Sequence, residues 1–258
     1  MEKYIIAVDM DGTLLNSENK ISERNKNVLQ RLIDDGHYVV PATGRTRELI
    51  PQEFSVLRGV KWGIVENGCV VWDYDKNEMI WRKTMPKGMV RKTPERGGKQ
   101  RYKGWIAEAY ANGIAYSDAD ARDYVASVAD KDLLEKTFVD YFSADMNMLR
   151  IFNHQKDILD QAEKINIYFD DMETSRALRE KWKDLDDVAV TTSISGNAEF
   201  NAAGVDKGVG LAMLRTKLGI DRMHVIAFGD NENDLEIAGG GRYRCCYGQF
   251  QTVCKGCS

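Results

Sequence analysis

Short runs of apolar residues recur along the chain, and four of them stand out: Tyr4–Val8, Tyr38–Val40, Trp62–Val65 and His224–Phe228. Runs of this length without polar alternation are typical of strands that are buried on both faces of a parallel sheet. Between the first two runs, apolar residues at helical spacing follow Ser22, a residue type that caps helices well. The pattern therefore predicts a strand–helix–strand unit at the start of an α/β fold.

The alternation of helix and apolar strand returns near the other end of the chain. Lys207 opens an amphipathic stretch whose apolar side includes Leu211, Leu214 and Leu218. The apolar run His224–Phe228 follows that stretch. We therefore expect the last part of the chain to complete the sheet that the first part begins.

The segment between these two regions has a different character. Its first part, residues 87–104, is basic and rich in glycine, which predicts an exposed helix or loop and, less favourably, a phosphate-recruiting surface. Farther on, strands and helices are mixed: strands are predicted at 114–116, 148–152 and 165–169, and helices at 157–164 and 173–183. We expect a core formed by residues 1–82 and 188–258, with a separate α+β cap domain at 83–187.

Composition narrows the possible functions. The chain has 258 residues, with 36 Lys and Arg against 40 Asp and Glu, so its net charge is -4. This balance argues against a nucleic-acid surface. No apolar run approaches the roughly 20 residues that a membrane span needs. The N-terminal segment lacks the features of a signal peptide, so we expect a cytoplasmic protein, whose oligomeric state the sequence leaves open.

The cysteines are concentrated at the end of the chain. Four of the five lie in the last fourteen residues, namely Cys245, Cys246, Cys254 and Cys257. A reducing compartment disfavours disulfides. The spacing of Cys254 and Cys257 would suit zinc, but the adjacent pair Cys245 and Cys246 is poor ligand spacing, so zinc is the less favoured interpretation.

Two carboxylates stand at the end of the first predicted strand. Asp9 and Asp11 are one residue apart and are followed by Gly12 and Thr13. A plain turn would account for Asp11 and Gly12, but it leaves Asp9 unexplained. In an open α/β sheet, ligands bind beyond the carboxyl ends of the strands, where two carboxylates repel unless a cation lies between them. Oxygen ligands of this kind suit Mg²⁺.

Polar residues also follow the second predicted strand. Thr43 offers a hydroxyl group there, and Gly44 lets a backbone N–H approach an anion closely; Arg45 comes next. Thr43 could equally be a helix cap, and the two interpretations are compatible because a helix N-terminus is itself an anion site.

Near the end of the chain, three more residues fit the same kind of site. Lys207 lies in the first turn of a predicted helix, against the preference of the helix dipole, which favours a role in binding an anion. Asp230 ends the last predicted strand, and Asp234 is one helical turn farther on, so both can face one cation.

The motifs DMDGTLL, TGRT, VDKG and GDNEND occur in this order, each at a predicted strand end or helix start. Together they resemble the haloacid dehalogenase (HAD) superfamily, in particular its Cof-type branch with a type IIB cap, over residues 1 to about 241. The resemblance implies a Rossmann-like, doubly wound parallel sheet core with an inserted α+β cap. It also implies an Mg²⁺-dependent phosphatase that acts on small phosphorylated metabolites such as sugar phosphates.

The resemblance further implies a role for each motif residue. Asp9 would be the nucleophile that forms an aspartyl-phosphate, and Asp11 the general acid and then the base. Arg45 would face the cap and the substrate. The implied phosphate- or substrate-binding residues are Met10, Thr43, Gly44, Arg45, Lys207 and Asn233. The implied metal site consists of Asp9, Asp11 through its backbone carbonyl and Asp230, with Asp234 supporting the metal shell. A phosphomutase with the same nucleophile, or a truncated non-catalytic relative, is the alternative.

The tail departs from the family pattern. Where a segment resembling GIGVAMGNA is expected, the chain has RYRCCYGQ from Arg242 onward, with no defensible helical or strand period. These residues can be encoded as AGG TAT CGG TGT TGC TAT GGG CAA, which, read one nucleotide later, gives Gly-Ile-Gly-Val-Ala-Met-Gly-Asn. We therefore consider a frame slip near Gly241, with a divergent terminus as the alternative. In both cases the last core strand is expected to be missing.

Overall fold

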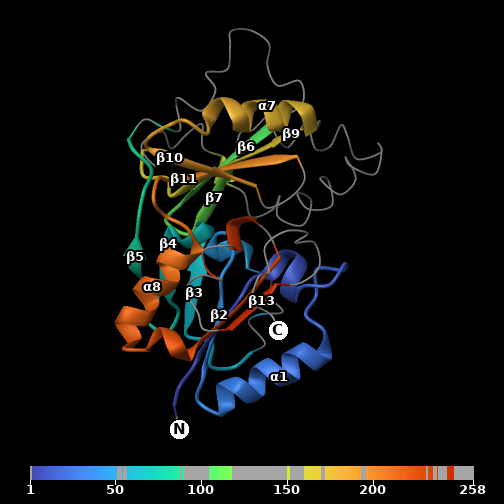
Figure 1. Cartoon of the computed structure of the whole chain (residues 1–258), viewed down its shortest axis with the longest axis vertical. Coiled ribbons are helices and arrows are strands. Elements are labelled where there is room, and N and C mark those ends of the chain that lie inside the picture. Colours follow the sequence, from blue (N-terminus) through green and yellow to red (C-terminus); the bar gives the residue numbers. More distant parts are fainter. Residues whose placement is uncertain are drawn as a thin grey trace. The chain divides into compact units, whose positions relative to one another are not determined.

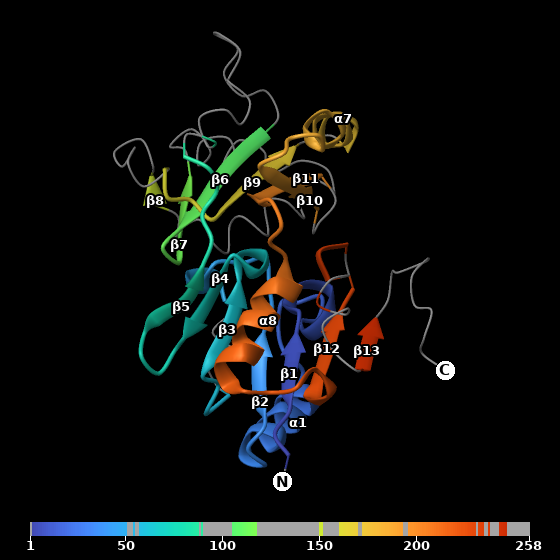
Figure 2. The ribbon, with the colours of Figure 1, turned by 60° about the vertical axis from the view of Figure 1, so that its left-hand side comes forward.

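The computed structural model describes residues 2–50, 54, 57–87, 89, 105–117, 150–151, 160–169, 172–192, 196–230, 232–234, 237 and 243–246. The chain forms two compact units, shown in Figures 1 and 2: Met1–Lys83 together with Val205–Ser258, and Thr84–Gly204. No helix in the described part of the chain is both long and apolar enough to cross a membrane.

A parallel sheet forms the centre of the first unit. Its strands are β1 (Ile5–Val8), β2 (Tyr38–Pro41), β12 (Val225–Gly229) and β13 (Tyr243–Cys246). They lie in the order β13-β12-β1-β2, and every neighbouring pair is parallel (Figure 2). Strand β1 is therefore flanked by β2 and β12, and the residues that follow these three strands meet at one edge of the sheet.

Two helices cover opposite faces of strand β1. These are α1 (Glu23–Asp34) and α8 (Lys207–Leu218). The even-numbered side chains of β1 pack in one apolar cluster with Leu29 of α1, and the odd-numbered ones pack in another with Leu211 and Leu214 of α8. Both helices were predicted, and burial on both faces explains why the strand is apolar throughout.

A three-stranded antiparallel sheet adjoins the parallel one. It has the order β3-β4-β5, and a parallel bridge between Ala42 and Ile64 links it to the end of β2. Its elements are β3 (Trp62–Val65), the short helix η3 (Glu66–Gly68), β4 (Val70–Asp73) and β5 (Glu78–Arg82). The predicted strand Trp62–Val65 is confirmed.

The second unit is α+β, as expected for a cap. Its six-stranded sheet has the order β10-β11-β9-β6-β7-β8, in which only β7 and β8 pair in parallel. Its elements are β6 (Trp105–Ala111), β7 (Ile114–Ser117), β8 (Arg150–Ile151), β9 (Lys164–Phe169), α7 (Met172–Trp182), β10 (Val188–Thr191) and β11 (Asn197–Ala202). Helix α7 contacts β9, β10 and β11.

The structure differs from the sequence-based expectations inside this unit. Strands β10 and β11 pair with each other and with β9, so the inserted unit continues to Gly204 and does not end at residue 187. Strand β6 was not predicted at all, although it pairs with both β9 and β7. Lys164, expected to end a helix, begins strand β9 instead. Most of the basic stretch 87–104 lies outside the described residues.

The tail also contains a strand that was not expected. Tyr243–Cys246 forms β13, which pairs with β12 from Ile226↔Tyr243 to Gly229↔Cys246. The expectation of a missing last core strand was therefore wrong. Backbone pairing with β12 forms the strand, although its side-chain pattern is not typical of a strand. Cys254 and Cys257, the CxxC pair considered for zinc, lie outside the described residues.

Candidate active site

Backbone pairing brings the first candidate residues together. The N–H of Asp9 donates to the carbonyl of Phe228 at 3.0 Å, and the N–H of Ala42 donates to the carbonyl of Val8 at 2.9 Å. Asp9 therefore lies between the ends of β12 and β2, next to the residues that begin at Thr43 and Asp230. This is the sheet edge at which α/β folds bind ligands.

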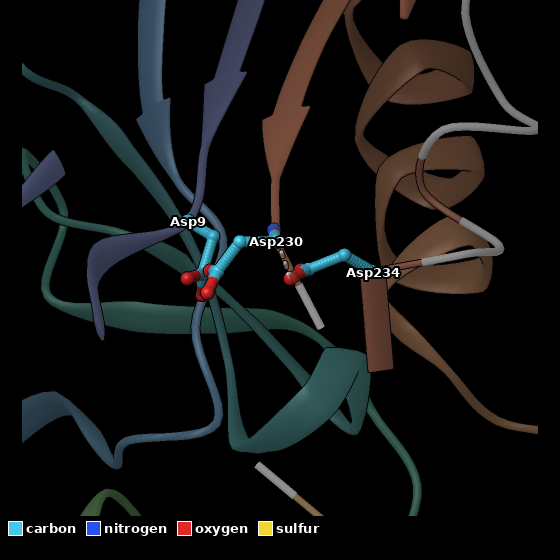
Figure 3. Close-up of side chains that lie close together, drawn as sticks. All are labelled: Asp9, Asp230 and Asp234. Carbon is cyan, nitrogen blue, oxygen red and sulfur yellow. Dashed lines mark hydrogen bonds between the residues drawn. The ribbon is translucent and has the colours of Figure 1, made fainter. Parts of the chain in front are cut away.

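Three carboxylates gather at this edge. One ligand oxygen from each of Asp9, Asp230 and Asp234 lies within 4.8 Å of the other two. Figure 3 shows the carboxylates of Asp9 and Asp230 close together, while Asp234 comes from the short helix η6 (Glu232–Asp234). Asp234 Oδ2 also accepts the Asp230 N–H at 3.1 Å. Oxygen donors so close together fit a hard divalent cation such as Mg²⁺.

The ammonium group of Lys207 lies among these acids. Its Nζ donates to Asp9 Oδ1 at 2.7 Å and to Asp234 Oδ1 at 2.6 Å, and the residue is fully buried. Asp206 caps the start of helix α8 by accepting the Val209 N–H at 2.8 Å. This cap gives one of the free N–H groups at the helix start a hydrogen-bond partner. The position of Lys207 is unfavourable relative to the helix dipole, and its two buried ion pairs offset that cost.

The cluster holds more negative charge than one ammonium can balance. Burial raises the pKa of Asp9 to about 8; the neighbouring Asp234 and Asp11 add to this rise, and Lys207 opposes it. Burial alone would lower the pKa of Lys207, but its two carboxylate partners outweigh this and raise it. Burial also raises the pKa of Asp230, against the hydrogen bond from Thr13. A divalent cation would compensate this excess charge.

The first motif also positions the last one. The Thr13 hydroxyl donates to Asp230 Oδ1 at 2.7 Å. Gly12 has a φ of +88°, and a Cβ atom there would lie 2.3 Å from Asp230 Oδ2. Only glycine permits this approach, so the Gly-Thr pair of the motif supports the carboxylate of Asp230.

The carboxylate of Asp11 is engaged with a different partner. Arg45 donates from Nε to Asp11 Oδ2 and from Nη2 to Asp11 Oδ1, both at 2.8 Å. Its remaining nitrogen, Nη1, donates to the carbonyl of Leu49 at 2.9 Å, and the residue is buried. The structure thus places Arg45, expected to face the substrate, on the predicted general acid.

The other predicted phosphate-binding residues are arranged around this cluster. Thr43 is fully buried, and its hydroxyl accepts the Arg45 N–H at 3.1 Å, with Gly44 between them in the chain. The side chain of Met10 is fully buried in an apolar cluster, so any contact with phosphate would have to come from its backbone. The amide of Asn233 donates to Asn67 Oδ1 at 3.1 Å.

Asn67 was not among the site residues predicted from the sequence. It lies in the Glu66–Asn67–Gly68 turn after β3, and the only sequence signal for it was the Asn-Gly dipeptide at a strand end. That dipeptide is far more often a simple turn. Its contact with a residue 166 positions away becomes visible only in the folded chain.

Similarity to known proteins extends over nearly the whole chain. The family model of haloacid dehalogenase-like hydrolases matches residues 6–241. The 5-amino-6-(5-phospho-D-ribitylamino)uracil phosphatase YcsE of Bacillus subtilis is 26% identical over 253 residues, covering 97% of this chain and 86% of that protein. A putative phosphatase of Buchnera aphidicola subsp. Acyrthosiphon pisum is 31% identical over 247 residues, covering 91% and 82%.

Solved structures agree with this match. A haloacid dehalogenase-like hydrolase from B. subtilis is similar with a TM-score of 0.76 at 22% identity, covering 93% of this chain and 88% of that one. The HAD subclass IIB sugar phosphatase BT4131 is similar with a TM-score of 0.72 at 18% identity, covering 96% and 88%. At these identities the likeness establishes the fold. Because the family match includes all four motifs, the chain belongs to the haloacid dehalogenase-like hydrolases, in the Cof-type branch that its motifs indicate.

Proposed function

We propose that this protein is an Mg²⁺-dependent phosphatase that hydrolyses small phosphorylated metabolites through an aspartyl-phosphate on Asp9. The observation that carries the proposal is the cluster of Asp9, Asp230 and Asp234, in which Asp9 and Asp234 are buried and paired with the ammonium of Lys207 and Asp230 is half-buried. Buried carboxylates are costly unless they are paired or hold a metal, so two of them beside a third carboxylate indicate a functional site.

The metal would be held by residues already close together. The carboxylates of Asp9, Asp230 and Asp234 would bind it, together with the backbone carbonyl of Asp11. When bound, Mg²⁺ neutralises charge and so lets an anionic carboxylate approach an anionic phosphate.

The chain's own residues would carry out the bond changes in two steps. An Asp9 oxygen attacks phosphorus while the bond from phosphorus to the ester oxygen breaks, and Asp11 gives its proton to the leaving oxygen. Asp11 then takes a proton from a water molecule, whose oxygen attacks phosphorus and releases Asp9 and inorganic phosphate. Lys207, Thr43, Gly44 and Asn233 would hold the phosphate oxygens, since phosphoryl transfer depends mainly on positioning and charge.

The substrate class is proposed from relatives. Three similar proteins of B. subtilis, at 26% to 27% identity, are named 5-amino-6-(5-phospho-D-ribitylamino)uracil phosphatase. We propose a phosphomonoester on a hydroxyl-rich carbon chain, the chemistry that ribityl and sugar phosphates share. A cytoplasmic location, expected from the sequence, agrees with such a substrate and is part of the proposal.

A substrate screen tests this function. The protein is incubated with a panel of sugar and polyol phosphates, with Mg²⁺ or with a chelator, and released phosphate is measured. We expect Mg²⁺-dependent release that Asp9→Asn abolishes, with no bisphosphate activator, which a phosphomutase would need. Turnover by Asp9→Asn would exclude the covalent mechanism. A complete lack of phosphate release across the panel would favour the non-catalytic alternative.

A further inference from the structure

The turn after β3 has an unusual backbone. Glu66, Asn67 and Gly68 have φ values of +55°, +54° and +89°, and all three residues are buried. The left-handed region is easy for Gly and tolerable for Asn, but it is unfavourable for Glu. Such a conformation persists where the surrounding structure imposes it, and it is found more often at functional sites.

This turn contacts the loop that follows β2. The N–H of Glu66 donates to the carbonyl of Arg45 at 2.9 Å, and the N–H of Asn67 donates to the carbonyl of Thr43 at 3.1 Å. The Thr46 hydroxyl donates to Glu66 Oε1 at 2.7 Å. The loop that carries Thr43 and Arg45 is therefore tied to the turn at three points.

The same turn also contacts the segment that carries Lys207. A Cβ atom at Gly68 would lie 1.9 Å from the carbonyl oxygen of Asp206, so the backbones touch there. On the other side, a Cβ atom at Gly210 would lie 3.0 Å from the Cα of Gly68. The start of helix α8 thus packs directly on the turn.

The side-chain amide of Asn67 lies against the side-chain amide of Asn233. Asn67 Oδ1 accepts from Asn233 Nδ2 at 3.1 Å, and both residues are buried. While Asn67 presents its Oδ1, a flipped Asn233 amide would place two acceptors against each other. Asn233 Oδ1 is buried without a partner among the described residues, so the contact with Asn67 is what distinguishes the two ends of the amide there. The second hydrogen on Nδ2 is left to donate to an anion.

We propose that Asn67 is a positioning residue for phosphate binding: it holds Asn233 with its amide nitrogen available to the phosphate and fixes Thr43 through its own backbone N–H. This inference rests on the proposed function, in which Asn233 and Thr43 contact phosphate. The competing explanation is that Asn is present only because its backbone tolerates a positive φ. Glycine tolerates that backbone equally well, so replacing Asn67 with Gly separates the two explanations.

The experiment measures kcat, KM and the affinity for inorganic phosphate, the last by calorimetry in the presence of Mg²⁺. We expect Asn67→Gly to lower kcat/KM about tenfold, as the loss of one positioned hydrogen bond would do, and to weaken phosphate binding. The matched control is Asn77→Gly, since Asn77 has a φ of +56° in the exposed turn between β4 and β5. We expect wild-type kinetics for it.

A double-mutant cycle tests whether Asn67 acts through Asn233. If it does, the double variant Asn67→Gly/Asn233→Ala is no slower than Asn233→Ala alone. Multiplicative losses of the two single variants, or wild-type kinetics of Asn67→Gly, would overturn the proposal. Asn67→Asp keeps an acceptor opposite Asn233 and tolerates a positive φ, so it should keep kcat within about threefold of wild type while its charge raises KM.

Asn67→Asp tests the proposal if Asn67→Gly does not fold, because a loss of kcat in Asn67→Asp as large as that of Asn233→Ala would contradict it.

A failure of the proposed function can be told apart from a failure of this inference. A wild-type protein without phosphatase activity refutes that function, and phosphate affinity then decides the inference. Coupled losses of affinity in the cycle support the role of Asn67, and independent losses or unchanged affinity overturn it.

Discussion

Arg45 holds Asp11 by both carboxylate oxygens, at 2.8 Å from Nε and 2.8 Å from Nη2. A third bond from Nη1 to the Leu49 carbonyl fixes the plane of the guanidinium group. A two-point contact of this kind fixes the orientation of a carboxylate. The orientation of the proposed general acid therefore depends on Arg45, which makes Arg45 a positioning residue for catalysis.

Replacing Arg45 with Lys should lower kcat about tenfold and leave KM nearly unchanged, because a lysine keeps the charge but loses the fork geometry that orients Asp11. Asp11→Asn should lower kcat more, by roughly 10² to 10⁴, since it removes the proton carrier itself. Steady-state kinetics on the best substrate measure both. Arg47→Lys is the matched control: it makes the same substitution at an arginine that stacks on the ring of Trp72, at 4.6 Å, and so shows what the exchange of Arg for Lys costs by itself. Wild-type kcat in Arg45→Lys would contradict this role.

Gly12→Ala should cost both stability and metal affinity. The φ of +88° costs about 1–2 kcal/mol for alanine, and the added Cβ would lie 2.3 Å from Asp230 Oδ2 and displace that carboxylate. Gly36→Ala is a close control, since Gly36 has a φ of +87° and a Cβ atom there would meet no heavy atom within 4 Å.

Both glycine variants should lose stability in thermal unfolding without Mg²⁺, and Gly12→Ala should lose more because its Cβ atom clashes with Asp230. Only Gly12→Ala should then show weaker Mg²⁺ binding and lower kcat. Equal Mg²⁺ affinity in the two variants would show that Gly12 does not support Asp230.

Magnesium binding should release a proton. Burial raises the pKa of Asp9 from 3.8 to about 8 in the metal-free protein. The folded protein thus binds this proton more tightly than the unfolded chain, so the stability of the metal-free protein should fall as pH rises across that interval. Mg²⁺ needs the ionised carboxylate, and its affinity should rise by up to about tenfold per pH unit until about pH 8.

Calorimetry in two buffers of different ionisation enthalpy measures the released proton directly. Asp9→Asn is the control, because an amide has no proton to release in this range. If the observed enthalpy per mole of bound Mg²⁺ is the same in both buffers below pH 8, no proton is released, and the assignment of the raised pKa to Asp9 is contradicted.

The frame-slip hypothesis for the tail makes a structural prediction. Strand β13 pairs with β12 at the edge of the parallel sheet, and its residues are Tyr-Arg-Cys-Cys. The shifted frame would place Ile-Gly-Val-Ala there, which better suits a strand of a covered parallel sheet. The family match ends at residue 241, immediately before the tail diverges.

We therefore expect the chain with the shifted frame to melt at a higher temperature than the chain with the present tail. Peptide mass spectrometry of the protein from its natural source identifies which tail is made. Peptides that contain Arg-Cys-Cys-Tyr would reject the frame slip and establish a divergent terminus.

Much of the first unit could be predicted from the chain alone. Buried strands need short, continuous apolar runs, so β1, β2 and β12 were recognisable, and so was β3, which pairs with β4 in the antiparallel sheet. A right-handed crossover places the ends of β1 and β2 together. The motif residues at those ends, from Asp9 to Asp234, follow from this placement. Strand β6 and the end of the inserted unit at Gly204 were not predictable in the same way, because pairing with β9 and β11 decides them.

Apart from Asn67, the chemical groups at the sheet edge follow from local sequence patterns, because the order of strands and turns is local information. Their pairing becomes visible only in the folded chain: Lys207 with Asp9 and Asp234, Arg45 with Asp11, and Asn67 with Asn233. These contacts join residues between 27 and 198 positions apart. They depend on strand register and on the close packing of glycines such as Gly12 and Gly68, which no local pattern encodes.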